Sequence, residues 1–247
     1  MRGILRMIPS SYGGGGIVVN PLWDGLQGYW NADNNPNDSK GTNNGVLTNG
    51  TSYGTGIINN GFSFDGVNDL VNMGDVLDIR LDSWTYNFWV KPTVVGAYVA
   101  LLGKANPTVN YPRWFIMLND GGKVDFMLQS VEGVIPLFTG NSTIVAGVET
   151  MISVVVNRNG PVKIYVNSVE ETVTARINYG GGIVANDISS RNTVDFNTTY
   201  DLSFGAFYNS LYPYNGIIDE IAIFKAIKTQ SEITELYNGG AGLQYIP

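Results

Sequence analysis

The stretch that decides the fold is GIIDEIAIF, residues 216–224, followed shortly by SEITELYN, residues 231–238. The first piece alternates apolar and polar side chains, which is the pattern of a half-buried β-strand. In the second, Ile233, Leu236 and Tyr237 have helical spacing, and Ser231 with its neighbouring carboxylates is a helix start signal. These stretches predict a strand followed by one short closing helix.

The sequence before residue 216 has the pattern of alternating strands and turns. The sequence predicts strands at 26–33, 61–73, 84–92, 97–103, 113–119, 123–130, 150–158, 161–169 and 201–206. Asn159-Gly160, between two of these strands, is a strong hairpin signal. Segment 170–200 is polar and weakly patterned, which predicts a long excursion over the surface. The spacing of strands and turns predicts an all-β, antiparallel two-sheet sandwich.

The chain of 247 residues divides into an N-terminal arm, residues 1–21, and one domain, residues 22–247. The run of glycines from Gly13 to Gly16 makes the arm flexible. Two interpretations of the arm remain open. It is either a disordered leader or a tether that docks on another subunit. Apolar residues near its tip favour docking, because exposed apolar side chains of this density are unusual without a partner. They are Ile4, Leu5, Met7 and Ile8.

The charge balance excludes two classes of partner. The net charge is −7, from 14 basic and 21 acidic residues, and the basic residues form no cluster. Such a chain has no electrostatic footprint for nucleic acid or for an anionic membrane. No stretch is long enough to span a membrane, so we expect no membrane insertion. Residues 1–9 hold no apolar run of signal-peptide length, which predicts synthesis in a cytoplasm without classical export.

The sequence also limits the chemistry. The chain has no Cys and no His, so thiolate and imidazole nucleophiles, bases and metal ligands are excluded. Any metal would need oxygen ligands, which favours calcium. A glycanase needs two carboxylates flanking one bond, commonly as Glu-x-Asp-x-Glu on one strand. The glutamates of this chain are scattered and form no such triplet. The sequence therefore predicts a protein that is not an enzyme.

Four segments in order resemble the laminin-G-like branch of the concanavalin A-like fold: residues 28–33, 62–69, 84–92, and 216–224 with the closing helix. The resemblance covers roughly residues 26 to 240. It implies a jelly roll of two antiparallel sheets with one short C-terminal helix, preceded here by the extended arm. It does not fix the function, because this fold includes lectins, adhesion modules, glycanases and structural domains.

The resemblance also implies a structural calcium ion between the end of the first strand and the last strand. The matching residues are Asp33 and Asp219, with Asp65 nearby in the pattern. In the predicted strand Asp219 shares a face with Ile221 and Ile223, so its carboxylate needs a cation or a set of backbone donors. The alternative is that Asp219 and Asp65 only cap turns through hydrogen bonds.

An aromatic loop, residues 207–215, is the candidate glycan-binding segment. Tyr208, Tyr212 and Tyr214 alternate there with amides and prolines, and Tyr111 and Trp114 join them if the strands bring them together. Sugar rings stack on aromatic faces while their hydroxyls bind planar polar groups. The same composition also fits a protein contact, and some of these rings could belong to the core.

The sequence is therefore compatible with two functions. The first is a non-enzymatic virion surface protein, a bacteriophage head-decoration or fibre subunit. Its arm would dock on capsid or tail proteins, and its jelly roll would serve adhesion or decoration on the particle surface. The second is an exported, calcium-stabilised carbohydrate-binding or adhesion module at the cell surface or outside the cell. Binding of a cell-surface glycan is compatible with both, and homo-oligomers remain open.

Overall fold

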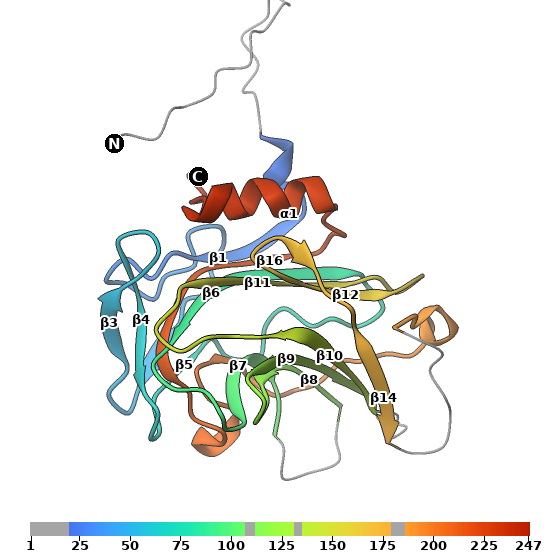
Figure 1. The fold of residues 1–247 in the computed structure, drawn as a ribbon, viewed down its shortest axis with the longest axis horizontal. Coiled ribbons are helices and arrows are strands. Elements are labelled where there is room, and N and C mark those ends of the chain that lie inside the picture. Colours follow the sequence, from blue (N-terminus) through green and yellow to red (C-terminus); the bar gives the residue numbers. More distant parts are fainter. Residues whose placement is uncertain (1–19, 107–111, 131–134, 179–185) are drawn as a thin grey trace, which may run out of the picture.

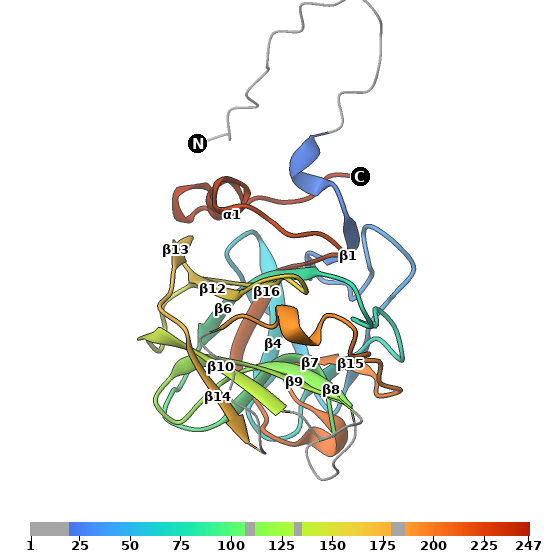
Figure 2. The same ribbon diagram turned by 90° about the vertical axis from the view of Figure 1, so that its right-hand side faces the viewer.

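The computed structural model describes residues 20–106, 112–130, 135–178 and 186–247. They form two antiparallel sheets of eight strands each, stacked face to face, with one α-helix against the outside of the first sheet (Figures 1 and 2). The predicted jelly-roll sandwich with a short C-terminal helix is thereby confirmed. Residues 1–19 of the predicted arm, with Ile4, Leu5, Met7 and Ile8, lie outside the described residues, and its last residue, Pro21, begins η1.

Sheet A has the order β13-β12-β11-β6-β16-β4-β3, with β1 also pairing with β16. Its strands are β1 (Leu26–Trp30), β3 (Ser52–Thr55), β4 (Asn60–Asp65), β6 (Trp84–Pro92), β11 (Thr150–Val156), β12 (Val162–Val166), β13 (Val169–Glu170) and β16 (Asn215–Phe224).

Sheet B has the order β14-β10-β9-β8-β7-β15-β5-β2. Its strands are β2 (Val46–Thr48), β5 (Leu70–Asn72), β7 (Val99–Lys104), β8 (Arg113–Leu118), β9 (Lys123–Gln129), β10 (Ile135–Thr143), β14 (Thr174–Asn178) and β15 (Leu202–Phe204). The helices are α1 (Gln230–Tyr237) and four short 3-10 turns, η1 (Pro21–Trp23), η2 (Ser189–Arg191), η3 (Tyr208–Ser210) and η4 (Asn238–Gly240).

The strands of sheet A are buried on both faces. In β11, Ile152, Val154 and Val156 point into the core between the sheets, whereas Met151 and Val155 point to the outside, beneath α1. Because side chains alternate along a strand, a run with both faces apolar needs a cover on each side. Sheet B covers one face, and α1 with the chain ends covers the other (Figure 1).

Helix α1 is held to sheet A by its apolar face. Ile233 and Leu236 are buried in the outer cluster, and Tyr237 stacks on Trp89 with ring centroids 5.6 Å apart. The helix starts two positions earlier than the sequence predicts, with Thr229 rather than Ser231 as its start signal. Thr229 and Glu232 form a reciprocal capping box, which satisfies two backbone N–H groups at the helix start.

The prediction for segment 170–200 was partly wrong. Residues 174–178 form β14, which pairs with β10 at the edge of sheet B. An edge strand is paired along one side only, and Thr174 and Arg176 on its exposed face hide the apolar pattern. Strand β10 itself was not predicted. The hairpin at Asn159-Gly160 is confirmed, since β11 and β12 pair on either side of it.

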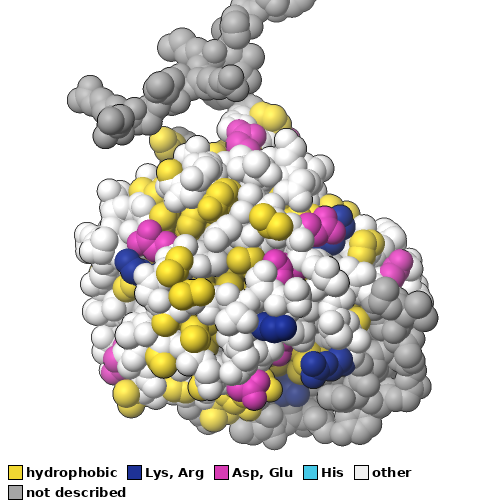
Figure 3. Space-filling view, in the orientation of Figure 1, with side chains coloured by type: hydrophobic (Ala, Val, Ile, Leu, Met, Phe, Trp, Pro, Cys, Tyr) yellow, Lys and Arg dark blue, Asp and Glu magenta, His cyan; other side chains and the backbone are white. Residues whose placement is uncertain are grey.

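The two faces of the sandwich differ in what covers them. The short helix η1, the C-terminus and α1 all lie on the sheet A side in both views, whereas the outer face of sheet B lies at the opposite side (Figures 1 and 2). On the face shown in Figure 3, Lys and Arg side chains are few and form no basic patch. Among the described residues, no helix is both long enough and apolar enough to span a membrane.

Candidate functional site on the outer face of sheet B

One row of residues crosses the whole outer face of sheet B. The pairing register aligns eight residues, one from each strand. In spatial order they are Arg176, Leu137, Met127, Phe115, Gly103, Ser203, Asn72 and Val46. Their strand neighbours Phe138, Phe126 and Trp114 point the other way, into the core. Alternation along each strand therefore fixes which side chains form this floor.

Gly103 lies in the middle of the row because no larger residue fits there. A Cβ atom at this position would lie 2.7 Å from Phe115 Cβ and 2.8 Å from the Trp114 carbonyl oxygen. Near this point the loop after β15 comes back over the sheet, and its residue Phe207 packs against Phe115 with ring centroids 5.2 Å apart. Phe207 thus covers the middle of the floor.

Two open hollows lie on either side of Phe207, which lines both. The tyrosine hollow, of about 310 Å³, lies over β7, β15 and β5. Besides Phe207, its polar and aromatic lining consists of Asn72, Thr199, Tyr200, Asp201, Ser203 and Tyr208. The arginine hollow, of about 260 Å³, lies over β8, β9 and β10. It is lined by Tyr98, Arg113, Phe115, Met117, Asp125, Met127, Leu137 and Tyr212, besides Phe207.

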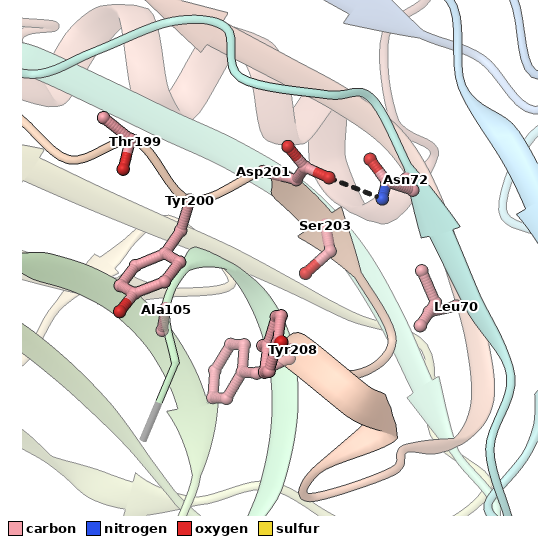
Figure 4. Close-up of a pocket in the computed structure, with 9 residues that line it drawn as sticks. Leu70, Asn72, Ala105, Thr199, Tyr200, Asp201, Ser203 and Tyr208 are labelled. Atoms are coloured by element: carbon pink, nitrogen blue, oxygen red, sulfur yellow. Dashed lines mark hydrogen bonds between the residues drawn. The ribbon is translucent and has the colours of Figure 1, made fainter. Parts of the chain in front are cut away.

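The tyrosine hollow combines ring faces with planar polar groups. Tyr200 and Tyr208 lie beside each other with ring centroids 6.3 Å apart, and Asn72 Nδ2 donates to Asp201 Oδ2 at 2.9 Å (Figure 4). A third hollow continues from Tyr200 past Thr199 and Thr198 to Pro112. Because neighbouring hollows share lining residues, the three adjoin one another, and together they are called the groove below.

The arginine hollow contains both signs of charge. The Asp125 carboxylate is buried, and its Oδ1 accepts hydrogen bonds from Thr139 Oγ1 at 2.7 Å and Asn119 Nδ2 at 3.0 Å. Burial raises the pKa of Asp125 above its usual value, although these two bonds oppose the shift. Burial also disfavours the charged form of Arg113 and so lowers its pKa. Arginine stays charged at neutral pH despite such a shift.

Two of the predicted ligand residues lie in this groove. Tyr208 is 51% exposed in the tyrosine hollow, and Tyr212 is 42% exposed in the arginine hollow. Tyr111 lies outside the described residues. The predictions for Tyr214 and Trp114 are contradicted by their burial, since both side chains are fully buried in the core between the sheets.

The reason is local in each case. Tyr214 packs against Phe64, and its hydroxyl donates to the Ile217 carbonyl at 3.2 Å. Trp114 packs against Tyr86, with ring centroids 4.6 Å apart, because it occupies an inward position of β8. Its neighbours Arg113 and Phe115 occupy the outward positions. Sequence reasoning missed both, although the alternation of β8 contained that information.

The predicted calcium residues Asp33 and Asp219 lie near each other, on the α1 side of sheet A and away from the groove. Asp219 is buried, and its Oδ2 accepts hydrogen bonds from the backbone N–H groups of Ile57 and Ile58 at 2.9 and 3.2 Å. Gly56 makes this approach feasible, because a Cβ there would lie 2.2 Å from the same oxygen. Asp33 Oδ1 accepts from the Asn60 N–H at 3.1 Å, so one loop holds both carboxylates.

A β-bulge in β16 changes the predicted face of Asp219. The pairing with β6 slips between Asp219 and Ala222, so Ile218, Ile221 and Ile223 face the core while Asp219 faces outward. The expectation that Asp219 shares a face with Ile221 and Ile223 was therefore wrong. Asp65 lies apart from the pair. It is opposite Asn215, four residues along β16 from Asp219, and its Oδ1 accepts from the Val67 N–H at 2.7 Å.

These contacts correspond to the hydrogen-bonding alternative that the sequence left open. Asp33 Oδ2 accepts from the side-chain amides of Asn31, Asn59 and Gln244 at 3.1–3.2 Å. The described residues contain no group of three or more acidic, His or Cys side chains placed to hold a metal ion. N–H donors thus bind the carboxylate oxygens of both Asp33 and Asp219 without a metal ion. Calcium binding stays a prediction.

The bulge also buries a second acid. Glu220 is buried, and neither of its carboxylate oxygens has a hydrogen-bond partner among the described residues. Burial raises the pKa of Glu220 to about 9. Burial also raises the pKa of Asp219 to about 7, against the effect of its backbone donors and with a contribution from nearby Asp33. Two adjacent acids are thus shifted towards their neutral forms.

Comparison with solved structures shows the same fold in binding domains. Domain 4 of AbnA, a GH43 extracellular arabinanase from Geobacillus stearothermophilus, was solved in complex with arabinotriose. It is 22% identical, with a TM-score of 0.59, over 85% of this chain and 97% of that one. The binding domain of Paraclostridial Mosquitocidal Protein 1 is 17% identical with a TM-score of 0.69, over 89% of this chain and 53% of that one.

The binding domain of Botulinum Neurotoxin DC, solved in complex with SialylT, is 15% identical with a TM-score of 0.65. The match covers 88% of this chain and 52% of that one. The chain therefore spans about half the length of these two toxin domains. No curated protein matches it in sequence. A family profile, however, matches residues 65–234, which is more than half of the chain. Together with the two-sheet architecture, this match shows that the chain belongs to the concanavalin A-like lectin/glucanases superfamily.

Proposed function

We propose that this protein is a non-catalytic glycan-binding domain and that the groove on the outer face of sheet B is its binding surface. The observation that carries the proposal is the pair of hollows around Phe207, each with an exposed tyrosine, Tyr208 or Tyr212, at its side. The fold neighbour solved with arabinotriose supports a sugar as the ligand.

The lining of the groove suits sugars in two respects. Tyrosine ring faces give flat apolar area for the carbon faces of a sugar ring. Amide and carboxylate groups, such as Asn72 and Asp201 in the tyrosine hollow, offer planar donors and acceptors for hydroxyl pairs. An open groove across several strands also leaves room for a ligand longer than one unit.

The carboxylates of the groove support binding without hydrolysis. Its two acidic lining residues are Asp125 on β9 and Asp201 at the start of β15, three strand spacings apart. At about 4.8 Å per strand this separates them by roughly 14 Å. Glycosidases hold their two carboxyl groups about 5 to 10 Å apart. Among the described residues lining the groove, no pair meets that requirement.

A glycan array with fluorescently labelled protein tests the proposal. We expect saturable binding to one glycan class. Tyr208→Ala and Tyr212→Ala should each weaken that binding about tenfold, or about 1.4 kcal/mol, without lowering the melting temperature. Ile246→Ala is the matched control, because Ile246 is 78% exposed on the α1 side. Binding that survives both tyrosine changes, or an array without any hit, would contradict the proposal.

A second candidate is display of this domain on a virus particle, as a bacteriophage decoration or fibre subunit. The favouring observation is the separation of η1 from the groove. Helix η1 lies on the α1 side, so attachment on that side would leave the outer face of sheet B turned away from the particle (Figure 2). Antibodies to residues 21–247 should then detect the protein in gradient-purified particles. Detection only in the soluble or cell-envelope fraction would instead favour an exported binding module.

A further inference from the structure

Arg113 and Gln129 lie opposite each other where the floor of the arginine hollow ends. The register pairs them across β8 and β9. Both occupy outward positions, because their strand neighbours Trp114 and Leu128 face the core. Directly paired residues on one face have Cβ atoms about 5 Å apart, so the two side chains start beside each other on this face.

Both side chains have hydrogen-bonding capacity that the described protein does not use. Gln129 is 0% exposed, and neither its Oε1 nor its Nε2 has a partner. Arg113 donates from Nη1 to the Asn106 carbonyl at 3.3 Å, but its Nε is buried without a partner. A buried donor that has lost its water and gained no acceptor costs free energy until a ligand supplies one.

Among the described residues, Arg113 also has no counter-ion, since none of their ion pairs includes it. The other charged residue of the hollow, Asp125, has two hydrogen bonds of its own, from Thr139 and Asn119. Arg176 lies on the same face, in the row through Leu137. This end of the groove thus has two arginines, although the whole chain has a net charge of −7.

A carboxylate fits these properties better than a hydroxyl does. The Nε and Nη donors of arginine form a planar fork that matches the two oxygens of a carboxylate. A sugar hydroxyl can accept one of these bonds but leaves the partly desolvated charge unpaired. The aromatic residues Phe115 and Tyr212 in the same hollow would contact the body of a sugar ring beside it.

We propose that the arginine hollow binds a sugar unit bearing a carboxylate, a uronic acid or a sialic acid, with Arg113 pairing its carboxylate. This inference rests on the proposed function and narrows its ligand class. Because the chain as a whole is acidic, long polyanions are repelled at a distance. An isolated acidic unit in or at the end of a largely neutral glycan is therefore the expected ligand.

Two pairs of sugars distinguish the sources of the carboxylate. Galacturonic acid is compared with galactose, and 3′-sialyllactose with lactose, by calorimetric or NMR titration of the full chain. We expect the acidic member of one pair to bind at least tenfold more tightly than its neutral partner. The pair that shows this preference identifies a uronic or a sialic acid. Raising NaCl from 20 to 500 mM should reduce the preference.

Three variants assign the effect to Arg113. Arg113→Gln should remove the preference for the acid, and Arg113→Lys should restore only part of it, because lysine keeps the charge but lacks the fork. Lys225→Gln, which removes one positive charge from the sheet A side, where Lys225 pairs with Asp82, should change affinity less than twofold. Thermal melting of each variant confirms that it folds.

Equal affinity for acidic and neutral partners, or a preference that survives Arg113→Gln, would overturn the inference while leaving glycan binding intact. Absence of binding by all four sugars would overturn it as well, and the glycan array would then decide the proposed function separately. Loss of preference in Lys225→Gln as large as in Arg113→Gln would show a general charge effect and would refute the assignment to Arg113.

Discussion

The ring of Phe207 lies 5.2 Å from the ring of Phe115, so a residue of the loop after β15 forms part of the floor of sheet B. This contact also orders the groove, because Tyr208 follows Phe207 directly and the Tyr212 ring lies 6.4 Å from it. The two exposed tyrosines therefore depend on one buried phenylalanine.

Shortening that side chain should weaken both folding and binding. Phe207→Leu leaves a gap above Phe115, and we expect it to lower the free energy of unfolding by about 1–2 kcal/mol. Urea unfolding measures this loss, and titration with the glycan found on the array measures binding. Phe138→Leu is the control, since Phe138 is equally buried but faces the inner core. It should lower stability alone; equal loss of binding in both variants would separate Phe207 from the groove.

The capping box of α1 gives a second prediction. Thr229→Ala removes the acceptor for the Glu232 N–H and should lower stability by about 1 kcal/mol, or the melting temperature by about 2–4 °C. Ser231→Ala, at the residue that the sequence pattern marked as the start, should have little effect because Ser231 is exposed within the first turn. Reversed effects of the two changes in thermal melts would show that the helix starts elsewhere.

Stability should fall as the pH rises from 5 to 9. Glu220 has a folded-state pKa of about 9 against an ordinary value of 4.5, so the folded state retains a proton that the unfolded state loses in this range. The loss by pH 9 is on the order of a few kcal/mol. The Asp219 pKa of about 7 adds to the loss in the lower part of the range.

Glu220→Gln isolates the first of these acids. The amide stays neutral at every pH, so this variant should melt at a higher temperature than the native protein at pH 9 and close to it at pH 5. Melting curves in EDTA, at pH 5, 7 and 9, make the comparison. An unchanged difference between the two proteins at all three pH values would mean that Glu220 does not titrate in this range.

Calcium binding between Asp33 and Asp219 has a direct test. If an ion binds there, saturating CaCl₂ should raise the melting temperature by several degrees over EDTA, since a ligand at 100 times its Kd adds about 2.7 kcal/mol. Asp219→Asn should then remove the shift, whereas Asp65→Asn should keep it. Identical melting in calcium and in EDTA would leave the backbone and amide donors as the only partners of this pair.

The sequence predicts most of the fold because apolar alternation marks strands that are buried. The strand at 84–92 is found with the predicted bounds, since every neighbour of β6 is another strand. Edge strand β14 lacks a second neighbour, and exposed Thr174 and Arg176 alternate with its inward residues, so the apolar pattern is weak. The bulge at Asp219 could not be predicted for another reason. One extra residue moves every later side chain of β16 to the opposite face, and no particular residue type marks such a bulge in the sequence.

The site is less predictable than the fold. A tyrosine-rich composition points to the loop after β15, but only the tertiary structure separates exposed Tyr208 and Tyr212 from buried Tyr214. Arg113 carries no signal of its own, because the other residues of its hollow, such as Met127 and Leu137, come from other strands.

The position of β16 has a consequence for how the chain is made. This strand lies inside sheet A, between β6 and β4, and also pairs with β1. Strand β1, residues 26–30, therefore has no pairing partner until residues 215–224 are synthesised. Strands β6 and β4 likewise cannot join one sheet before then. Pairings between strands so distant along the chain form slowly. A nascent chain that stops short of Asn215 has every strand of the groove sheet and still lacks the strand that completes the opposite one.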